Sequence, residues 1–144
     1  MKENWDTHTS DWQPTFEQVT VSIQLAREAL SKKKMILLTS GPWGCPHPCD
    51  MNEQEMKEKI TMPMAIFLMM VEPGAYLNYQ QSSLFSNTPS EHWKADSSSL
   101  PEFTNALGEP MGPPIKIGNT FARSFEHLTV TVDLFNEIAT LDWH

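Results

Sequence analysis

Residues 35–39, with the sequence MILLT, form a continuous apolar run between a helical pattern and the turn sequence Ser40-Gly41-Pro42. Continuous rather than alternating apolarity predicts a strand buried on both faces, as in a parallel sheet. A second short strand is predicted over residues 75–79, AYLNY, after another helical stretch. The order helix, strand, helix, strand is that of a βαβ unit, in which the two strands run parallel.

Two helices flank these strands. The first is predicted over residues 15–33, where Thr15 and Gln18 form a capping box and three lysines follow at the C-terminal end. Its apolar face carries Phe16, Val19, Ile23, Ala26 and Leu30 at steps of three and four. The second is predicted to begin at Asn52, to kink at Pro63 and to end before Pro73-Gly74.

The last thirty residues alternate polar and apolar side chains, which is typical of half-buried strands. Three segments show this pattern, residues 115–125, 127–134 and 138–143, and Asn136-Glu137 is a plausible turn between the last two. We therefore predict an α/β segment with parallel strands over residues 1–100, followed by a linker and a small antiparallel β unit over residues 101–144.

The length and charge of the chain exclude several classes of protein. Its 144 residues form one compact domain but fall short of the roughly 250 of a complete (β/α)8 barrel. Ten Lys and Arg against 18 Asp and Glu give a net charge of -8, which disfavours nucleic acid and anionic membrane surfaces as partners. The sequence contains no secretory signal and no apolar run of membrane-spanning length, and it does not indicate a compartment.

Tryptophan is concentrated in three segments that the parallel topology places together. Residues 1–14, 40–51 and 80–100 lie next to the carboxyl ends of the predicted strands, where ligands collect in parallel α/β units. They hold four of the five tryptophans, and an indole ring suits the C–H face of a sugar. We predict carbohydrate contacts first for Trp43, Tyr79 and Trp93, and second for Trp5 together with Asp6. The competing interpretation is that such rings close the edge of a core.

Catalytic and metal-binding residues are not assigned by the sequence. Glycosidases need two carboxyl groups at a set distance, and no acidic pair has a diagnostic spacing. Glu72 is interpreted as the end of a helix. Cys45-Pro46-His47-Pro48-Cys49 has thiolate and imidazole ligands that suit zinc, but no second ligand pair follows. A structural or disulfide role is the favoured interpretation, so we expect neither a metal nor a cofactor.

The C-terminal stretch from Leu107 to Trp143 resembles the closing segment of TIM-barrel glycoside hydrolases from poorly characterised families. In these proteins a pattern like LGxPxG is followed by a glycine, an aromatic-x-Arg-x-Phe motif and a valine-rich strand. The matching residues here are Leu107, Gly108, Pro110, Gly112, Gly118, Phe121, Arg123, Phe125, Val130 and Val132. Residues 67–79 similarly resemble the last helix and final barrel strand, and the similarity extends over residues 14–143.

The resemblance implies that the chain is the last third of a barrel, with the catalytic carboxylates on strands that it lacks. We expect a glycoside-hydrolase-like C-terminal fragment that is inactive or slow alone, with carbohydrate as ligand. Its partner would be the missing N-terminal barrel portion or a second copy. The alternatives are a non-catalytic carbohydrate-binding or interaction module, and a metal-dependent module using Cys45, His47 and Cys49. In-frame sequence upstream of Met1 would favour the enzyme, and stoichiometric zinc would favour the metal module.

Overall fold

The computed structural model describes residues 15–41, 43, 52–79 and 101–144. Strands β1 (Ile36–Ser40) and β2 (Ala75–Tyr79) form a two-stranded parallel sheet, in register from Ile36 opposite Ala75 to Ser40 opposite Tyr79. The prediction that these segments lie side by side and point the same way is confirmed. Because both strands end at the same edge, the segments that follow them leave from neighbouring points.

The prediction that the first strand is buried on both faces is wrong. Along β1 burial alternates between partly buried and exposed residues, and Leu37 is 63% exposed. Its partner Tyr76 on β2 is 56% exposed. Helices α1 (Phe16–Ser31) and α3 (Thr61–Met70) contact β1 and β2, respectively, and within the described residues no further element covers Leu37 and Tyr76. The sheet is therefore only half enclosed.

The helices begin where the capping patterns predicted. The Oγ1 of Thr15 accepts a hydrogen bond from Gln18 N, and the Gln18 side chain accepts one from Thr15 N, which completes the capping box of α1. After α1, Lys33 takes a φ of 57° and the chain turns into β1. The predicted second helix is two helices, α2 (Glu53–Glu58) and α3, and the break precedes Pro63. Pro63 lies in the first turn of α3, where its missing N–H removes no helical hydrogen bond.

The C-terminal part forms an antiparallel sheet, as predicted, but with four strands in the order β3-β4-β5-β6 where three segments were predicted. The predicted strand over residues 115–125 is divided into β3 (Ile115–Ile117) and β4 (Thr120–Ser124), because Gly118 takes a φ of 60° and reverses the chain. Strands β5 (Leu128–Asp133) and β6 (Ile138–Trp143) follow. A short 3-10 helix, η1 (Pro101–Phe103), precedes the sheet.

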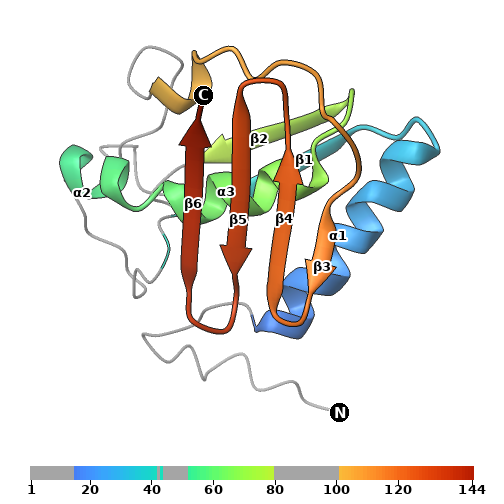
Figure 1. Cartoon of the computed structure of the whole chain (residues 1–144), viewed down its shortest axis with the longest axis horizontal. Coiled ribbons are helices and arrows are strands. Elements are labelled where there is room, and N and C mark those ends of the chain that lie inside the picture. Colours follow the sequence, from blue (N-terminus) through green and yellow to red (C-terminus); the bar gives the residue numbers. More distant parts are fainter. Residues whose placement is uncertain (1–14, 42, 44–51, 80–100) are drawn as a thin grey trace, which may run out of the picture.

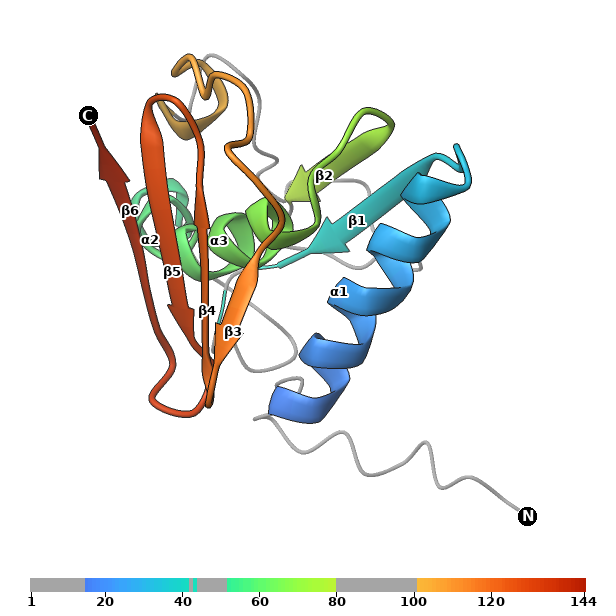
Figure 2. The same cartoon turned by 45° about the vertical axis from the view of Figure 1, so that its right-hand side comes forward.

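Helix α3 joins the two parts of the molecule. It lies behind the four-stranded sheet and beside the parallel pair, as Figures 1 and 2 show. Eight of its ten residues are buried, since it contacts β4, β5 and β6 as well as α1 and β2. Side chains from both predicted parts, 1–100 and 101–144, form a single core cluster. No helix in the described ranges is long and apolar enough to cross a membrane.

Candidate functional site

The carboxyl ends of the parallel strands carry the first candidate site. Ser40 and Tyr79 are paired there, and Trp43 follows three residues after β1. The Trp43 ring is partly buried against the core, and its Nε1 is buried without a hydrogen-bond partner in the described part of the chain. A buried N–H without an acceptor costs on the order of 1 to 3 kcal/mol. The indole N–H therefore marks a place where a ligand or water oxygen would be stabilising.

Tyr79 has a structural role in this arrangement. Its side chain is 1% exposed, and its hydroxyl donates a 2.7 Å hydrogen bond to the backbone oxygen of Met56 in α2. Burial raises the pKa of the Tyr79 hydroxyl well above its usual range. The ring is thus enclosed by protein, where a sugar cannot stack on it, and it fixes α2 against β2 just before the chain leaves the sheet.

Several predicted site residues lie outside the described residues. These are Trp5, Asp6 and Trp93 of the predicted sugar contacts, and Cys45, His47 and Cys49 of the metal motif. Trp43 and Tyr79 are consequently the two predicted contacts that the structure locates, and it brings them to the same end of the sheet. Among the described residues, no group of three or more His, Cys, Asp or Glu side chains is arranged to hold a metal ion.

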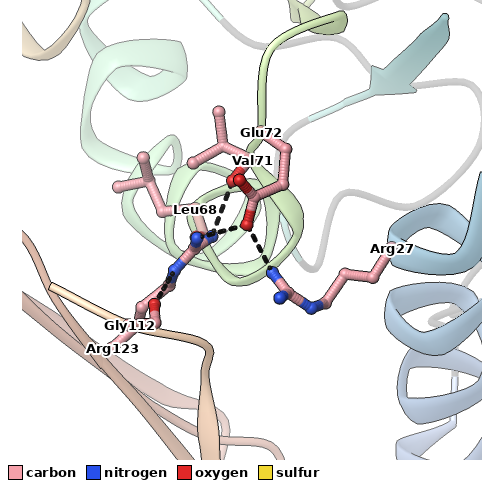
Figure 3. Close-up of polar contacts among 6 residues, drawn as sticks. All are labelled: Arg27, Leu68, Val71, Glu72, Gly112 and Arg123. Carbon is pink, nitrogen blue, oxygen red and sulfur yellow. Dashed lines mark hydrogen bonds and ion pairs between the residues drawn. The ribbon is translucent and has the colours of Figure 1, made fainter. Parts of the chain in front are cut away.

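The amino ends of the strands carry a polar cluster centred on Arg123 (Figure 3). Its guanidinium Nη1 donates to the carbonyl oxygens of Leu68, at 3.0 Å, and Val71, at 2.8 Å. Its Nε donates to Gly112 O at 3.1 Å, and its Nη2 donates to Glu72 Oε1 at 2.8 Å. Arg123 therefore binds the C-terminal end of α3 to β4 and to the segment that precedes β3.

Glu72 completes this cluster by accepting hydrogen bonds from two arginines. Its Oε1 lies 3.0 Å from Arg27 Nη1 of α1 and 2.8 Å from Arg123 Nη2. Burial lowers the pKa of Arg123, and the neighbouring Glu72 carboxylate opposes that shift. The side chain of Arg123 is 1% exposed, whereas that of Glu72 is 34% exposed. The cluster thus pairs a buried charge at its centre with solvated groups at its rim, as expected for a structural ion pair.

The C-terminal motif is a single packed unit. Pro110 forms a β-bridge with Phe125. The Nε of Arg123 donates to Gly112 O, and the guanidinium lies 5.0 Å from the centre of the Phe125 ring. Gly108 takes a φ of 74°, and a Cβ added there would lie 2.5 Å from the Cβ of Glu126. Gly108 is therefore explained by its left-handed backbone and its contact with the Glu126 side chain, and Arg123 by its hydrogen bonds and packing, rather than by chemistry on a substrate.

Sequence reasoning did not identify the role of Arg123, although a signal was present. Phe121 and Arg123 of β4 and Phe125, the residue directly after it, are spaced two apart, and all three are buried. A charged residue on the apolar face of a strand needs a buried partner. Glu72 was interpreted as the end of a helix, and in the structure it lies two residues beyond the last residue of α3.

The sequence also matches a known protein family. The family model described as hypothetical glycosyl hydrolase family 15 matches residues 1–129, which is most of the chain. A comparison with curated proteins finds nothing that matches.

Proposed function

The chain belongs to hypothetical glycosyl hydrolase family 15, and we propose that it supplies the carbohydrate-contacting C-terminal portion of a glycoside-hydrolase-like barrel enzyme. The observation that carries this proposal is the in-register parallel pairing of β1 and β2, which ends at Ser40 and Tyr79. In parallel α/β proteins, ligands bind outside the carboxyl ends of the strands. Trp43, with its buried unpaired N–H, follows one of these ends.

The half-enclosed sheet supports the barrel part of the proposal. Parallel strands occur almost only where both faces are covered. Here Leu37 and Tyr76 form an exposed cross-strand pair on the face away from α1 and α3. Further strands, from a preceding barrel portion or a second copy of the chain, would cover these side chains. The chain alone is then expected to bind saccharide without appreciable hydrolysis, because the catalytic carboxylates would belong to the other strands.

The proposed contacts differ in role. Trp43 would offer its ring and its indole N–H to the sugar, with Trp93, Trp5 and Asp6 as further contacts. Tyr79 would act indirectly, because its hydrogen bond to Met56 O holds the start of the segment after β2. No cofactor is required, since glycosidic bonds are cleaved by carboxyl groups alone in most such enzymes.

Affinity electrophoresis in gels containing soluble polysaccharides tests the proposal. We expect at least one polysaccharide to retard the chain and Trp43→Phe, which lacks the indole N–H, to weaken this retardation severalfold. Trp143→Phe is the matched control, because Trp143 lies in β6 and also packs partly buried against the core. Circular dichroism would verify that both variants fold.

The outcomes separate the candidate functions. Retardation that depends on Trp43 supports the proposed site. Retardation that depends instead on residues of the β3–β6 sheet favours a non-catalytic binding module, and unchanged migration across a broad panel contradicts carbohydrate binding by this chain. Reducing-sugar release by the chain alone would contradict its proposed dependence on further strands.

A further inference from the structure

A pocket of about 560 Å³ lies at the amino ends of the parallel strands, opposite the proposed sugar contacts. It is formed by the C-terminal half of α1 and by the residues that lead into β1 and β2. Pockets of roughly 300 to 1,000 Å³ are typical of small-molecule sites. The lining combines apolar groups, Leu30, Met35 and Pro73, with the charged side chains Arg27, Lys33, Lys34 and Glu72.

The charges around this pocket do not balance. Glu72 is the one acidic side chain among the lining residues, and it already accepts hydrogen bonds from Arg27 and from the buried Arg123. Its single negative charge offsets one of these two arginines, and Lys33 and Lys34 add two further positive charges. The C-terminal dipole of α1 contributes only about half a negative charge. A clear positive surplus therefore remains.

This surplus is unexpected for the chain as a whole, whose net charge is -8. The positive charges of the pocket are also not fully paired within the fold. In the described part of the chain, the hydrogen-bond partner of the Arg27 side chain is Glu72, which takes one of its five N–H donors. The Arg27 side chain is 27% exposed. Lys32, by contrast, forms an ion pair with Glu28 one turn back on the helix and does not line the pocket.

We propose that this pocket binds a small organic anion through its phosphate or carboxylate group. Arg27 would provide a planar fork of donors suited to either oxyanion, and Lys33 and Lys34 would provide point charges beside it. The apolar side chains Leu30 and Met35 would cover the carbon skeleton of the ligand. The inference does not rest on the proposed glycoside-hydrolase function, since the pocket lies at the opposite end of β1 and β2.

Isothermal titration with three compounds that share one sugar ring tests this inference. Glucose 6-phosphate, glucuronate and glucose present phosphate, carboxylate and no charge, and we expect millimolar binding of one or both anions that weakens as salt is added. Binding of both indicates a general oxyanion site, and binding of one identifies the preferred group. Equal binding of glucose and the anions, or no binding of either anion, overturns the proposal.

Matched lysine variants locate the site. The double variant Lys33→Gln/Lys34→Gln should weaken anion binding by about tenfold. Lys32→Gln changes an adjacent charge outside the pocket lining and should leave affinity within about twofold. A loss with Lys32→Gln as large as that of the double variant would overturn the proposal, because it would show general charge attraction instead of a defined pocket. All three substituted positions are exposed lysines, so the fold should be retained, which circular dichroism checks.

Discussion

Replacement of Arg123 by Met should destabilise the chain more than any substitution of a partly exposed charge. Met keeps an unbranched apolar stem but removes four hydrogen bonds, to Leu68 O, Val71 O, Gly112 O and Glu72 Oε1. Removing one partner of a buried ion pair typically costs about 3 to 5 kcal/mol. Glu72 is 34% exposed and keeps Arg27, so its stranded charge adds little. We expect the free energy of unfolding to fall by about 3 kcal/mol, mainly through the orphaned carbonyl groups.

Urea unfolding followed by circular dichroism measures this loss. An unchanged slope of the unfolding free energy against urea concentration would show that only stability has changed. Arg27→Met is the matched control. It removes one ion pair with Glu72 at a side chain that is 27% exposed, and should cost about 1 kcal/mol or less. Arg123→Lys keeps the charge without the planar fork and should lose most of the same stability. The reasoning is refuted if Arg123→Met unfolds within about 1 kcal/mol of the wild type, or if Arg27→Met is equally destabilising.

Three further predictions concern single contacts. Gly118→Ala should lower the free energy of unfolding by about 1 to 2 kcal/mol, because alanine is strained in the left-handed backbone at this position. Gly108→Ala should cost at least about 1 kcal/mol more, because its Cβ would also meet the side chain of Glu126. Equal losses of the two variants in urea unfolding would contradict this. Tyr79→Phe should lose about 1 to 2 kcal/mol at neutral pH, because the buried hydroxyl loses its hydrogen bond to Met56 O. This advantage of the wild type should shrink as the pH rises above about 10, because the tyrosine of the unfolded chain ionises there while burial keeps the pKa of the folded hydroxyl higher. A constant difference between about pH 7 and pH 11 would be evidence against it. Thr15→Ala should lower thermal stability by about 1 kcal/mol, and no change in the melting temperature would argue against the capping box seen at α1.

The elements that could be predicted from the sequence are those with local causes. The capping box at Thr15 and the helical pattern that opens at Asn52 identified the starts of α1 and α2. The alternation of polar and apolar residues identified the antiparallel strands. The parallel pairing of β1 and β2 followed from the order of the elements. The division of the second helix was missed, because Pro63 was interpreted as an internal kink when it lies in a first turn.

The candidate sites depended more strongly on long-range contacts. Tyr79 was chosen for its position at the end of a strand, but its hydroxyl is held by Met56 of α2, 23 positions away in the sequence. The cluster of Arg123, Glu72 and Arg27 joins residues 45 to 51 positions apart. A local sequence pattern cannot predict which distant carboxylate forms the ion pair with a buried arginine. The pocket at the amino ends of the strands likewise arises only once α1 lies beside the loop at Gly74.

The most direct test of the account is an NMR titration that follows the indole Nε1–H signals of the tryptophans as an oligosaccharide is added. We predict that the Trp43 signal shifts progressively, because its N–H is buried and has no partner in the described part of the chain until a sugar oxygen accepts it. The Trp143 signal, on β6, should stay in place. A shift of Trp143 with Trp43 unmoved would contradict the proposed carbohydrate site at the carboxyl ends of the parallel strands.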